Sequence, residues 1–300
     1  MGLRRMLRIG LGVLIGTAAL TLSVSAQRAP QPLSITVNQI KPNIYWASGG
    51  GGNSGIIIGD NGVIVVDAKS TAEGAKLLIA EIAKLTPKPI THVFVTHSDA
   101  DHWGGLDAFP ANATVIASEG FRKEQQVITA AGDAPNQRVP NRLVKQGREP
   151  MTIDGVKLEA IFWVPGHTSG DLLVFIPDQR IVFTGDVTSN ARPEPTLHEN
   201  KGATADGWIA TVNKIVALPA DLFVNGHGEA DTFQRSWLEQ RLKSATETRD
   251  KVVAMVKEGR SLGDIKTALK SAPQPASGNP TYVEVVYWNA LLRGTKSGTK

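Results

Sequence analysis

Residues 97–102 read HSDADH and follow the run Val93, Phe94, Val95 and Thr96, which reads as a buried strand. Imidazole and carboxylate groups are the side chains that bind divalent metal ions of borderline or hard character. Loops at the ends of buried strands bring such residues together from distant parts of a chain. Three more segments place this kind of side chain in a glycine-marked loop after an apolar run: PGHTSGD with His167, FTGDV with Asp186 and NGHGE with His227. The sequence therefore predicts a metal centre.

Strands and helices that would position these residues alternate along the chain. Their hydrophobic spacing predicts strands at 43–46, 55–58, 63–67, 90–96, 156–163, 172–176, 181–184 and 222–224, and helices at 71–85, 204–218 and 236–259. Helix, strand and helix signals continue to residue 131, and a polar loop follows at 132–141. The segment from residue 261 reads as helical with a break at 271–280, and its tail at 295–300 is expected to fray. Strands followed by helices occur in both halves of the sequence, and no linker-like segment separates the halves. This order predicts two sheets packed together, with helices on their outer faces.

The pattern His97-x-Asp99-x-Asp101-His102, followed in order by His167, Asp186 and His227, resembles the metallo-β-lactamase superfamily. The resemblance extends over about residues 44–228. It implies an α/β fold of the four-layer αββα type, formed as a single domain by residues 27–300, with C-terminal helices from about residue 232.

The resemblance also implies a pair of divalent metal ions. The first would be held by His97, Asp99 and His167, the second by Asp101, His102 and His227, with Asp186 bridging the two. Ions this close would lower the pKa of a shared water and polarise a carbonyl oxygen, so that hydroxide attacks without a protein nucleophile. Asp101 is expected to orient that water and to return a proton to the leaving group.

Asp99 departs from the family pattern, which has a histidine at this position. A carboxylate attracts the ion more strongly but reduces its Lewis acidity, and it favours oxygen-binding metals such as iron or manganese. The flavodiiron branch of the superfamily similarly has glutamate here, but it carries a flavodoxin-like extension that this sequence lacks, so oxygen reduction is not expected. We expect Asp99 to replace one ligand in a zinc enzyme, with iron or manganese as the alternative.

Residues around these motifs have more than one interpretation. Asp67, at the end of a predicted strand, is expected to support the metal loops without binding the ion. His92 lies inside a strand and is expected to pack or to form a hydrogen bond. His198 is expected at the solvated rim, with a substrate contact as the alternative. The loop at 49–52, GGGG, lacks the lysine and following helix of a phosphate-binding loop and is interpreted as a mobile flap.

Substrate contacts are expected in two places. Trp103 either lines the pocket or packs beneath it. The loop after Asp186 carries polar groups that suit a substrate carboxylate, namely Ser189, Asn190, Arg192 and Lys201. The alternative for Arg192 and Lys201 is an ordinary solvated charge.

The N-terminal 26 residues predict a cleavable signal peptide. Three arginines precede an apolar run at 9–22, and small residues at 24–26 place the cleavage after Ala26. The run is short for a transmembrane anchor, which is the alternative, and Arg4-Arg5 leaves Sec or twin-arginine export open.

Loss of three arginines leaves 29 basic against 28 acidic residues, a net charge of +1 that gives no reason to expect nucleic-acid binding. We expect a periplasmic or secreted protein with no stable membrane insertion after cleavage.

These observations predict an exported, metal-dependent hydrolase that opens the carbonyl of a small-molecule β-lactam, lactone, ester or thioester. The absence of cysteine excludes disulfides and the β-lactamase subclasses with a thiolate ligand. The cysteine-free subclass is the most similar, although Asp99 and the bridging Asp186 depart from it. The alternatives are a metal-binding accessory protein with weak or no turnover and a non-heme diiron redox protein. The oligomeric state is left open.

Overall fold

The computed structural model describes residues 33–132, 138–163, 165–190, 192–275 and 278–297. Residues from Leu33 onward form one compact unit. The predicted signal peptide and the centre of the polar loop at 132–141 lie outside the described residues.

The first sheet has seven strands in the order β1-β2-β3-β4-β5-β6-β7. They are β1 (Thr36–Lys41), β2 (Ile44–Ser48), β3 (Ser54–Ile58), β4 (Val63–Val66), β5 (Ile90–Phe94), β6 (Thr114–Ser118) and β7 (Arg142–Val144). Neighbours are antiparallel from β1 to β4 and parallel from β4 to β7. Because β4 and β5 are parallel, the loops that follow them leave the same edge of the sheet.

The second sheet has five strands in the order β12-β11-β10-β9-β8. They are β8 (Gly147–Ile153), β9 (Val156–Phe162), β10 (Leu172–Ile176), β11 (Ile181–Gly185) and β12 (Leu222–Asn225). Strand β11 is parallel to β12, and β10 is antiparallel to both β9 and β11. Strands β9, β11 and β12 therefore point the same way, and the loops after them meet at one edge.

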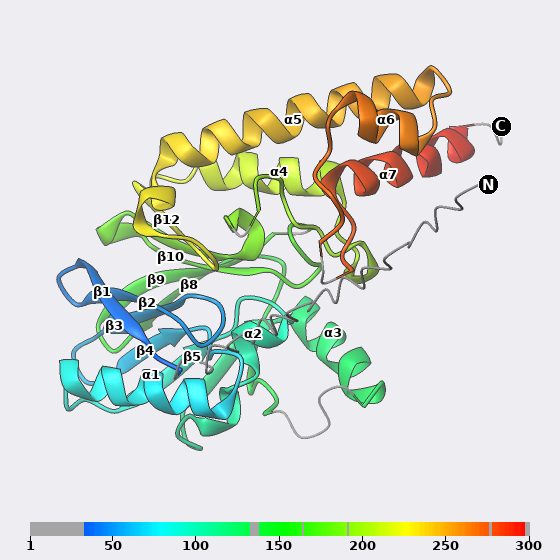
Figure 1. Cartoon of the computed structure of the whole chain (residues 1–300). Coiled ribbons are helices and arrows are strands. Elements are labelled where there is room, and N and C mark those ends of the chain that lie inside the picture. The colour runs from blue at the N-terminus through cyan, green and yellow to red at the C-terminus, as the bar shows by residue number, and fades with distance from the viewer. Residues whose placement is uncertain (1–32, 133–137, 164, 191, 276–277, 298–300) are drawn as a thin grey trace, which may run out of the picture. The chain divides into compact units, whose positions relative to one another are not determined.

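Helices cover the outer face of each sheet, so that four layers result (Figure 1). Helices α1 (Ala72–Leu85) and α3 (Glu119–Ala130) lie on the first sheet, with the short α2 (Ala100–Trp103) beside them. Helices α4 (Ala205–Val216), α5 (Arg235–Lys257), α6 (Leu262–Ala268) and α7 (Tyr282–Ser297) lie on the side of the second sheet. The predicted αββα fold is confirmed.

Alternating side chains within the strands hold the layers together. In β4, Ile64 and Val66 point into the core between the two sheets, while Val63 and Val65 pack against the helix layer that contains α1. A third apolar core joins the outer face of the second sheet to α4, α5 and α7. Burial of each such Val or Ile side chain stabilises the fold by about 1.5–3 kcal/mol. Within the described residues, no helix has the length and apolar character needed to cross a bilayer.

Three strands were not predicted, and all lie at the edges of sheets. Strands β1 and β7 are the outermost strands of the first sheet, and β8 is the outermost strand of the second. The predicted helices at 71–85, 204–218 and 236–259 correspond to α1, α4 and α5. Helix α7 continues to Ser297, into the tail for which fraying was expected.

Candidate metal centre

The candidate ligands lie in loops at the carboxyl ends of strands of both sheets. His97 follows β5, Asp99 caps α2, and Asp101 and His102 lie within that short helix. Asp186 directly follows β11, and His167 and His227 follow β9 and β12. The parallel strand directions described above bring these loops to one place, as expected for ligand sites in sheets of this kind.

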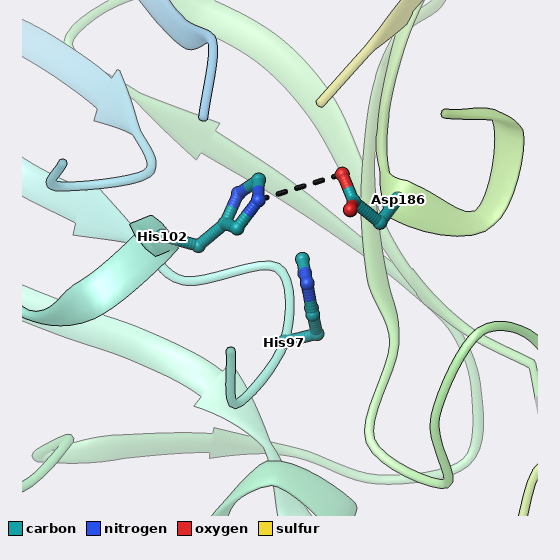
Figure 2. A group of neighbouring side chains, drawn as sticks. All are labelled: His97, His102 and Asp186. Carbon is teal, nitrogen blue, oxygen red and sulfur yellow. Dashed lines mark ion pairs between the residues drawn. The ribbon is translucent and has the colours of Figure 1, made fainter. Parts of the chain in front are cut away.

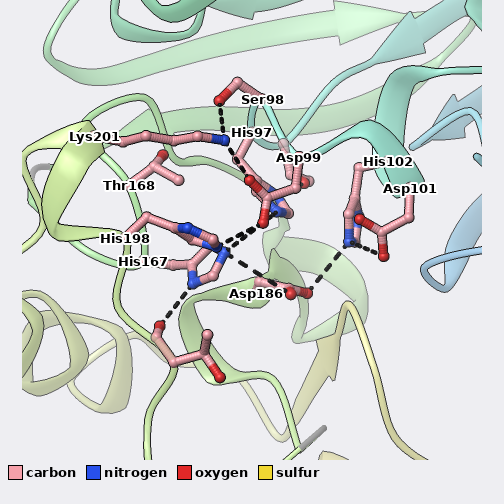
Figure 3. Close-up of polar contacts among 12 residues, drawn as sticks. His97, Ser98, Asp99, Asp101, His102, His167, Thr168, Asp186, His198 and Lys201 are labelled. Carbon is pink, nitrogen blue, oxygen red and sulfur yellow. Dashed lines mark hydrogen bonds and ion pairs between the residues drawn. The ribbon is translucent and has the colours of Figure 1, made fainter. Parts of the chain in front are cut away.

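His97, Asp99 and His167 form one group of possible ligand atoms. Their contacts converge on the Asp99 carboxylate (Figure 3): Oδ2 lies 3.1 Å from Nε2 of His167 and 3.7 Å from Nε2 of His97. Both imidazoles are buried, and Asp99 is largely so. This is the set that the sequence predicted for the first ion.

Asp101, His102 and His227 form a second group. Nε2 of His227 lies 2.9 Å from Oδ2 of Asp101 and 3.3 Å from Nε2 of His102. His102 is fully buried, whereas Asp101 and His227 are the more exposed members. This is the set predicted for the second ion.

Asp186 lies between the two groups, as predicted for a bridging residue. Its Oδ1 atom is 3.4 Å from Nε2 of His102, as Figure 2 shows, and its Oδ2 atom is 3.5 Å from Nε2 of His227 and 4.0 Å from Nε2 of His167. His97, His102 and Asp186 also form a group of possible ligand atoms. One carboxylate thus lies against histidines of both groups.

Hydrogen bonds at Nδ1 orient three of the imidazoles. Nδ1 of His167 lies 2.7 Å from the carbonyl oxygen of Thr196, and Nδ1 of His102 lies 2.8 Å from Oδ2 of Asp67. A carbonyl or carboxylate oxygen can only accept a hydrogen bond, so the Nδ1 atoms of His167 and His102 must each carry a proton and donate it. Nδ1 of His97 lies 2.9 Å from the Thr96 hydroxyl, which donates to Asp67 and therefore accepts from His97. In the neutral rings, Nε2 then keeps a free lone pair that faces the site, as a metal ligand requires.

Buried charges in the cluster shift one another's pKa values. Burial opposes the charge of His102, but Asp186 and Asp67 raise its pKa to about 10. Burial also opposes the charge of His167, and its bond to Asp99 raises its pKa to about 9. Burial alone would raise the pKa of Asp99, yet the imidazoles of His167, His198 and His97 hold it well below its usual range. In the metal-free protein His102 and His167 are thus imidazolium groups paired with carboxylates.

Two buried polar atoms in the site indicate that these residues suit a metal ion. Nε2 of His97 and Oδ1 of Asp186 are buried and have no hydrogen-bond partner. Such atoms are rare in folded proteins because each loses its hydration without a replacement. Both belong to predicted ligands and meet in one cluster with His102 (Figure 2). The donor set therefore fits a divalent cation.

Two residues of the loop before α4 lie elsewhere than expected. His198 was predicted at the solvated rim, but its side chain is only 12% exposed and its Nε2 lies 2.9 Å from Oδ2 of Asp99. That prediction is wrong because the loop folds back over the first ligand group. Lys201 lies 2.5 Å from Oδ1 of Asp99, so its ammonium already has an anionic partner, and its role as a substrate contact stays a prediction. His92 bonds to Thr91 within its strand, as expected.

Trp103 does not line the pocket. Its side chain is buried in the core of the first sheet, packs edge-on against Phe121 and donates from Nε1 to the carbonyl oxygen of Ser98. Of the two alternatives expected for Trp103, packing beneath the site is the one observed, and Trp103 supports the loop that carries Asp99.

Two of the other expected substrate contacts, Ser189 and Asn190, are bonded through their backbones to candidate ligands. Ser189 is buried, and its amide donates to the carbonyl oxygen of Asp186. The amide of Asn190 donates to the carbonyl oxygen of His227. Asn190 and Arg192 also line an open pocket of about 290 Å³, together with residues of α5 such as Trp237. The expected role of Ser189, Asn190 and Arg192 in substrate binding stays a prediction.

The glycine-rich loop at 49–52, which was expected to be a mobile flap, is bonded to the rest of the fold at Gly50 and Gly52. Gly52 donates to the carbonyl oxygen of Asp101, and a Cβ atom at Gly52 would lie 2.3 Å from the ring of His102. Lys69, fully buried, donates from Nζ to the carbonyl oxygens of Ala47 and Gly52, and burial lowers its pKa to about 7. The loop therefore acts as a wall against which His102 packs.

Asp67 occupies the position that the sequence predicted for it. Its two oxygens accept from the amide and hydroxyl of Thr96 and from His102, and neither of its oxygens belongs to a ligand group.

One family of known proteins matches this sequence. The sequence profile of the metallo-β-lactamase superfamily matches residues 47–227, more than half of the chain and all of the candidate ligands. The chain belongs to the metallo-β-lactamase superfamily. The clusters described above are the residues that could hold divalent metal.

Individual relatives are distant. The α subunit of 2,4-dinitroanisole O-demethylase from Nocardioides sp. is 26% identical over 196 residues, which cover 65% of this chain and 58% of the relative. A type 2 metallo-β-lactamase from Bacillus sp. is 24% identical over 254 residues, covering 75% of this chain and 92% of the relative. Among solved structures, an inverting secondary alkylsulfatase from Pseudomonas sp. superposes with a TM-score of 0.68 at 18% identity, over 86% of this chain and 50% of that one. This chain thus spans only about half of the length of some relatives, and the likeness in structure supports the fold alone.

Proposed function

We propose that this protein is an exported hydrolase with two zinc ions that opens the carbonyl of a small β-lactam, lactone, ester or thioester. The observation that carries the proposal is the position of Asp186, one carboxylate against histidines of both ligand groups. The β-lactamase relative supports a lactam among the substrates. The other relatives show that this fold accepts further leaving groups, which widens the set of substrates to be tried.

Each ligand group would hold one ion. His97, Asp99 and His167 would hold the first, and Asp101, His102 and His227 the second, with Asp186 shared. When bound, the two ions supply Lewis acidity toward the carbonyl and lower the pKa of a water molecule.

Asp101 is the residue best placed to handle the proton of the attacking water. Its side chain is 36% exposed, against 18% for Asp99 and 10% for Asp186, so it is the carboxylate of the site most open to substrate. Burial opposes its charge, but the bond to His227 holds the pKa of Asp101 well below its usual range. Asp101 is therefore ionised at neutral pH and can accept a hydrogen bond from water, orient it and pass its proton to the leaving group.

Asn190 and Arg192 are proposed to bind the substrate beyond the reacting carbonyl. Both line the same open pocket, and the amide of Asn190 is bonded to the backbone of His227, a member of the second ligand group. The guanidinium of an arginine suits a substrate carboxylate, which it can hold through two parallel hydrogen bonds.

The test is hydrolysis of a substrate panel by protein of known metal content. A β-lactam, a lactone, an ester, a thioester and an alkyl sulfate would be supplied to the zinc-loaded protein, with and without a chelator. The proposal expects turnover of at least one carbonyl substrate that the chelator abolishes and added zinc restores. Metal uptake without any turnover would favour an accessory protein, and a visible absorption band from bound iron would favour a diiron redox protein.

Export is part of the proposal and has its own test. The arginines and apolar run of residues 1–26 support a cleaved signal peptide and a periplasmic or secreted location. N-terminal sequencing of the protein from its native host should begin at Gln27. A chain that still begins at Met1 would contradict export with cleavage.

A further inference from the structure

Both oxygens of the Asp99 carboxylate are bound by residues of a single loop. Nζ of Lys201 lies 2.5 Å from Oδ1, and Nε2 of His198 lies 2.9 Å from Oδ2 (Figure 3). The two residues are three positions apart, in the loop that leads from Asp186 to α4. Nothing in the sequence motif that contains Asp99 predicts either contact.

The loop is fixed by its backbone as well as by these side chains. The amide of His198 donates to the carbonyl oxygen of His167 over 3.0 Å, and the amide of Ser169 donates to the carbonyl oxygen of Lys201 over 2.9 Å. Thr196, two residues before His198 in this loop, accepts the hydrogen bond that orients His167. The same loop therefore positions both His167 and the partners of Asp99.

Lys201 also contacts a second polar group next to Asp99. Its ammonium donates to the hydroxyl of Ser98 over 3.0 Å, and that hydroxyl donates to Oε2 of the buried Glu124 over 2.5 Å. Glu124 in turn accepts from the amide and hydroxyl of Ser169. The ammonium thus lies in a built polar network that defines its position.

Burial makes the pairing of Lys201 with Asp99 important. Each side chain is only 18% exposed, so each charge is largely withdrawn from water and needs a partner of opposite sign. Together the two residues are neutral. The first ligand group then has the net charge of its imidazoles alone, even though one of its members is an aspartate.

We propose that Lys201 is a positioning residue that offsets the charge of Asp99, so that Oδ1 is taken by the ammonium and Oδ2 faces the first metal site. His198 also contacts Oδ2, with its Nε2 atom 2.9 Å away. The consequence is that the aspartate does not by itself convert the site to one that prefers iron or manganese. This inference rests on the metal centre of the proposed function.

The experiment compares zinc affinity in wild type, Asp99→His, Lys201→Met and the double variant. Zinc dissociation constants would be measured on metal-free protein by competition with a chromophoric chelator. Asp99→His alone should weaken zinc binding by about tenfold or more, because the ammonium is left buried beside a neutral ligand. Adding Lys201→Met to that variant should return the affinity to within about threefold of wild type, a coupling expected only for residues in direct contact.

Two further variants keep the result interpretable. Asp99→Asn retains the size of the side chain and should show the same rescue by Lys201→Met if Asp99→His does not fold. Lys84→Met removes a surface lysine that pairs with Glu81 over 2.7 Å, and it should not rescue Asp99→His. Circular dichroism would confirm that each variant is folded.

The possible failures are distinguishable. If wild type takes up no zinc, the proposed metal centre itself is wrong. If wild type binds zinc but Lys201→Met fails to improve Asp99→His, so that the two effects simply add, Lys201 does not offset the charge of Asp99.

Discussion

Oδ2 of Asp67 lies 2.8 Å from Nδ1 of His102. The same carboxylate accepts a hydrogen bond from the hydroxyl of Thr96, and that hydroxyl accepts a hydrogen bond from Nδ1 of His97. One carboxylate therefore orients a histidine in each ligand group. Asp67 lies at the end of β4 with φ of +66°, a conformation in which aspartate and asparagine are tolerated better than most residues. The strand end and the metal centre are linked through this side chain.

Replacing Asp67 by asparagine should weaken metal binding while the fold is retained. Asparagine adopts the same backbone conformation, but it lacks the charge that holds the proton on Nδ1 of His102. We expect zinc affinity to fall by about tenfold to a hundredfold, the usual effect of losing such a partner. Chelator competition measures this effect. Asp154→Asn is the matched control, since Asp154 also has positive φ and also bonds a threonine hydroxyl, that of Thr91. Equal losses in both variants would contradict a specific role of Asp67.

A methyl group at Gly52 should disturb the second ligand group. The added Cβ would lie 2.3 Å from the ring of His102, which is fully buried and cannot move aside easily. Gly52→Ala should therefore destabilise the protein by about 1–3 kcal/mol and weaken zinc binding by about tenfold or more. Gly263→Ala in α6 is the control, because its nearest neighbour would be 3.8 Å away. Thermal unfolding and chelator competition measure the two effects, and unchanged zinc affinity in Gly52→Ala would refute the packing argument.

The metal-free protein should lose stability as the pH rises through about 9 to 10. In the folded state the pKa of His167 is raised to about 9 and that of His102 to about 10, above the value of an unfolded histidine. Their stabilisation is therefore complete below the unfolded pKa, about 6.5. It disappears as the folded groups deprotonate. Zinc competes with these protons, so its apparent affinity should increase over the same range. The difference between the melting temperatures measured with and without zinc should therefore increase from pH 6 to pH 10. A difference that stays constant would contradict the raised pKa values of His167 and His102.

Loss of a ligand should abolish hydrolysis and remove most of the stabilisation by metal. His227→Ala is the cleaner variant, because His227 is partly exposed whereas truncation of the buried His167 also leaves a cavity. We expect turnover of any substrate found in the panel to fall by at least about a hundredfold. The rise in melting temperature on addition of zinc should shrink as well. A variant that keeps both turnover and the zinc-induced rise would show that His227 is not a ligand.

The sequence predicts the interior of the fold better than its edges. Strands such as β4 and β10 are continuous apolar runs because both of their faces are buried. Strand β1, TVNQIK, and strand β8, GREPMTI, show no such run, because an edge strand is partly exposed and tolerates charged residues and proline. These strands form through pairing with a neighbour, which local patterns do not reveal.

The candidate ligands were predictable, whereas their surroundings were not. His97, Asp101 and His227 each lie in a short motif at the end of a strand, where local sequence carries the signal. His198 and Lys201 are site residues only because their loop returns over Asp99, and that return depends on tertiary contacts with the His167 loop. A histidine three positions before a lysine in a polar loop gives no local sign of this.

The most direct test of the account is elemental analysis of the purified mature protein after reconstitution with zinc, expressed as ions per chain. Two zinc ions per chain in the wild type, both removable by a chelator, are the result that the account predicts. A protein that retains no metal at this site after reconstitution would contradict it.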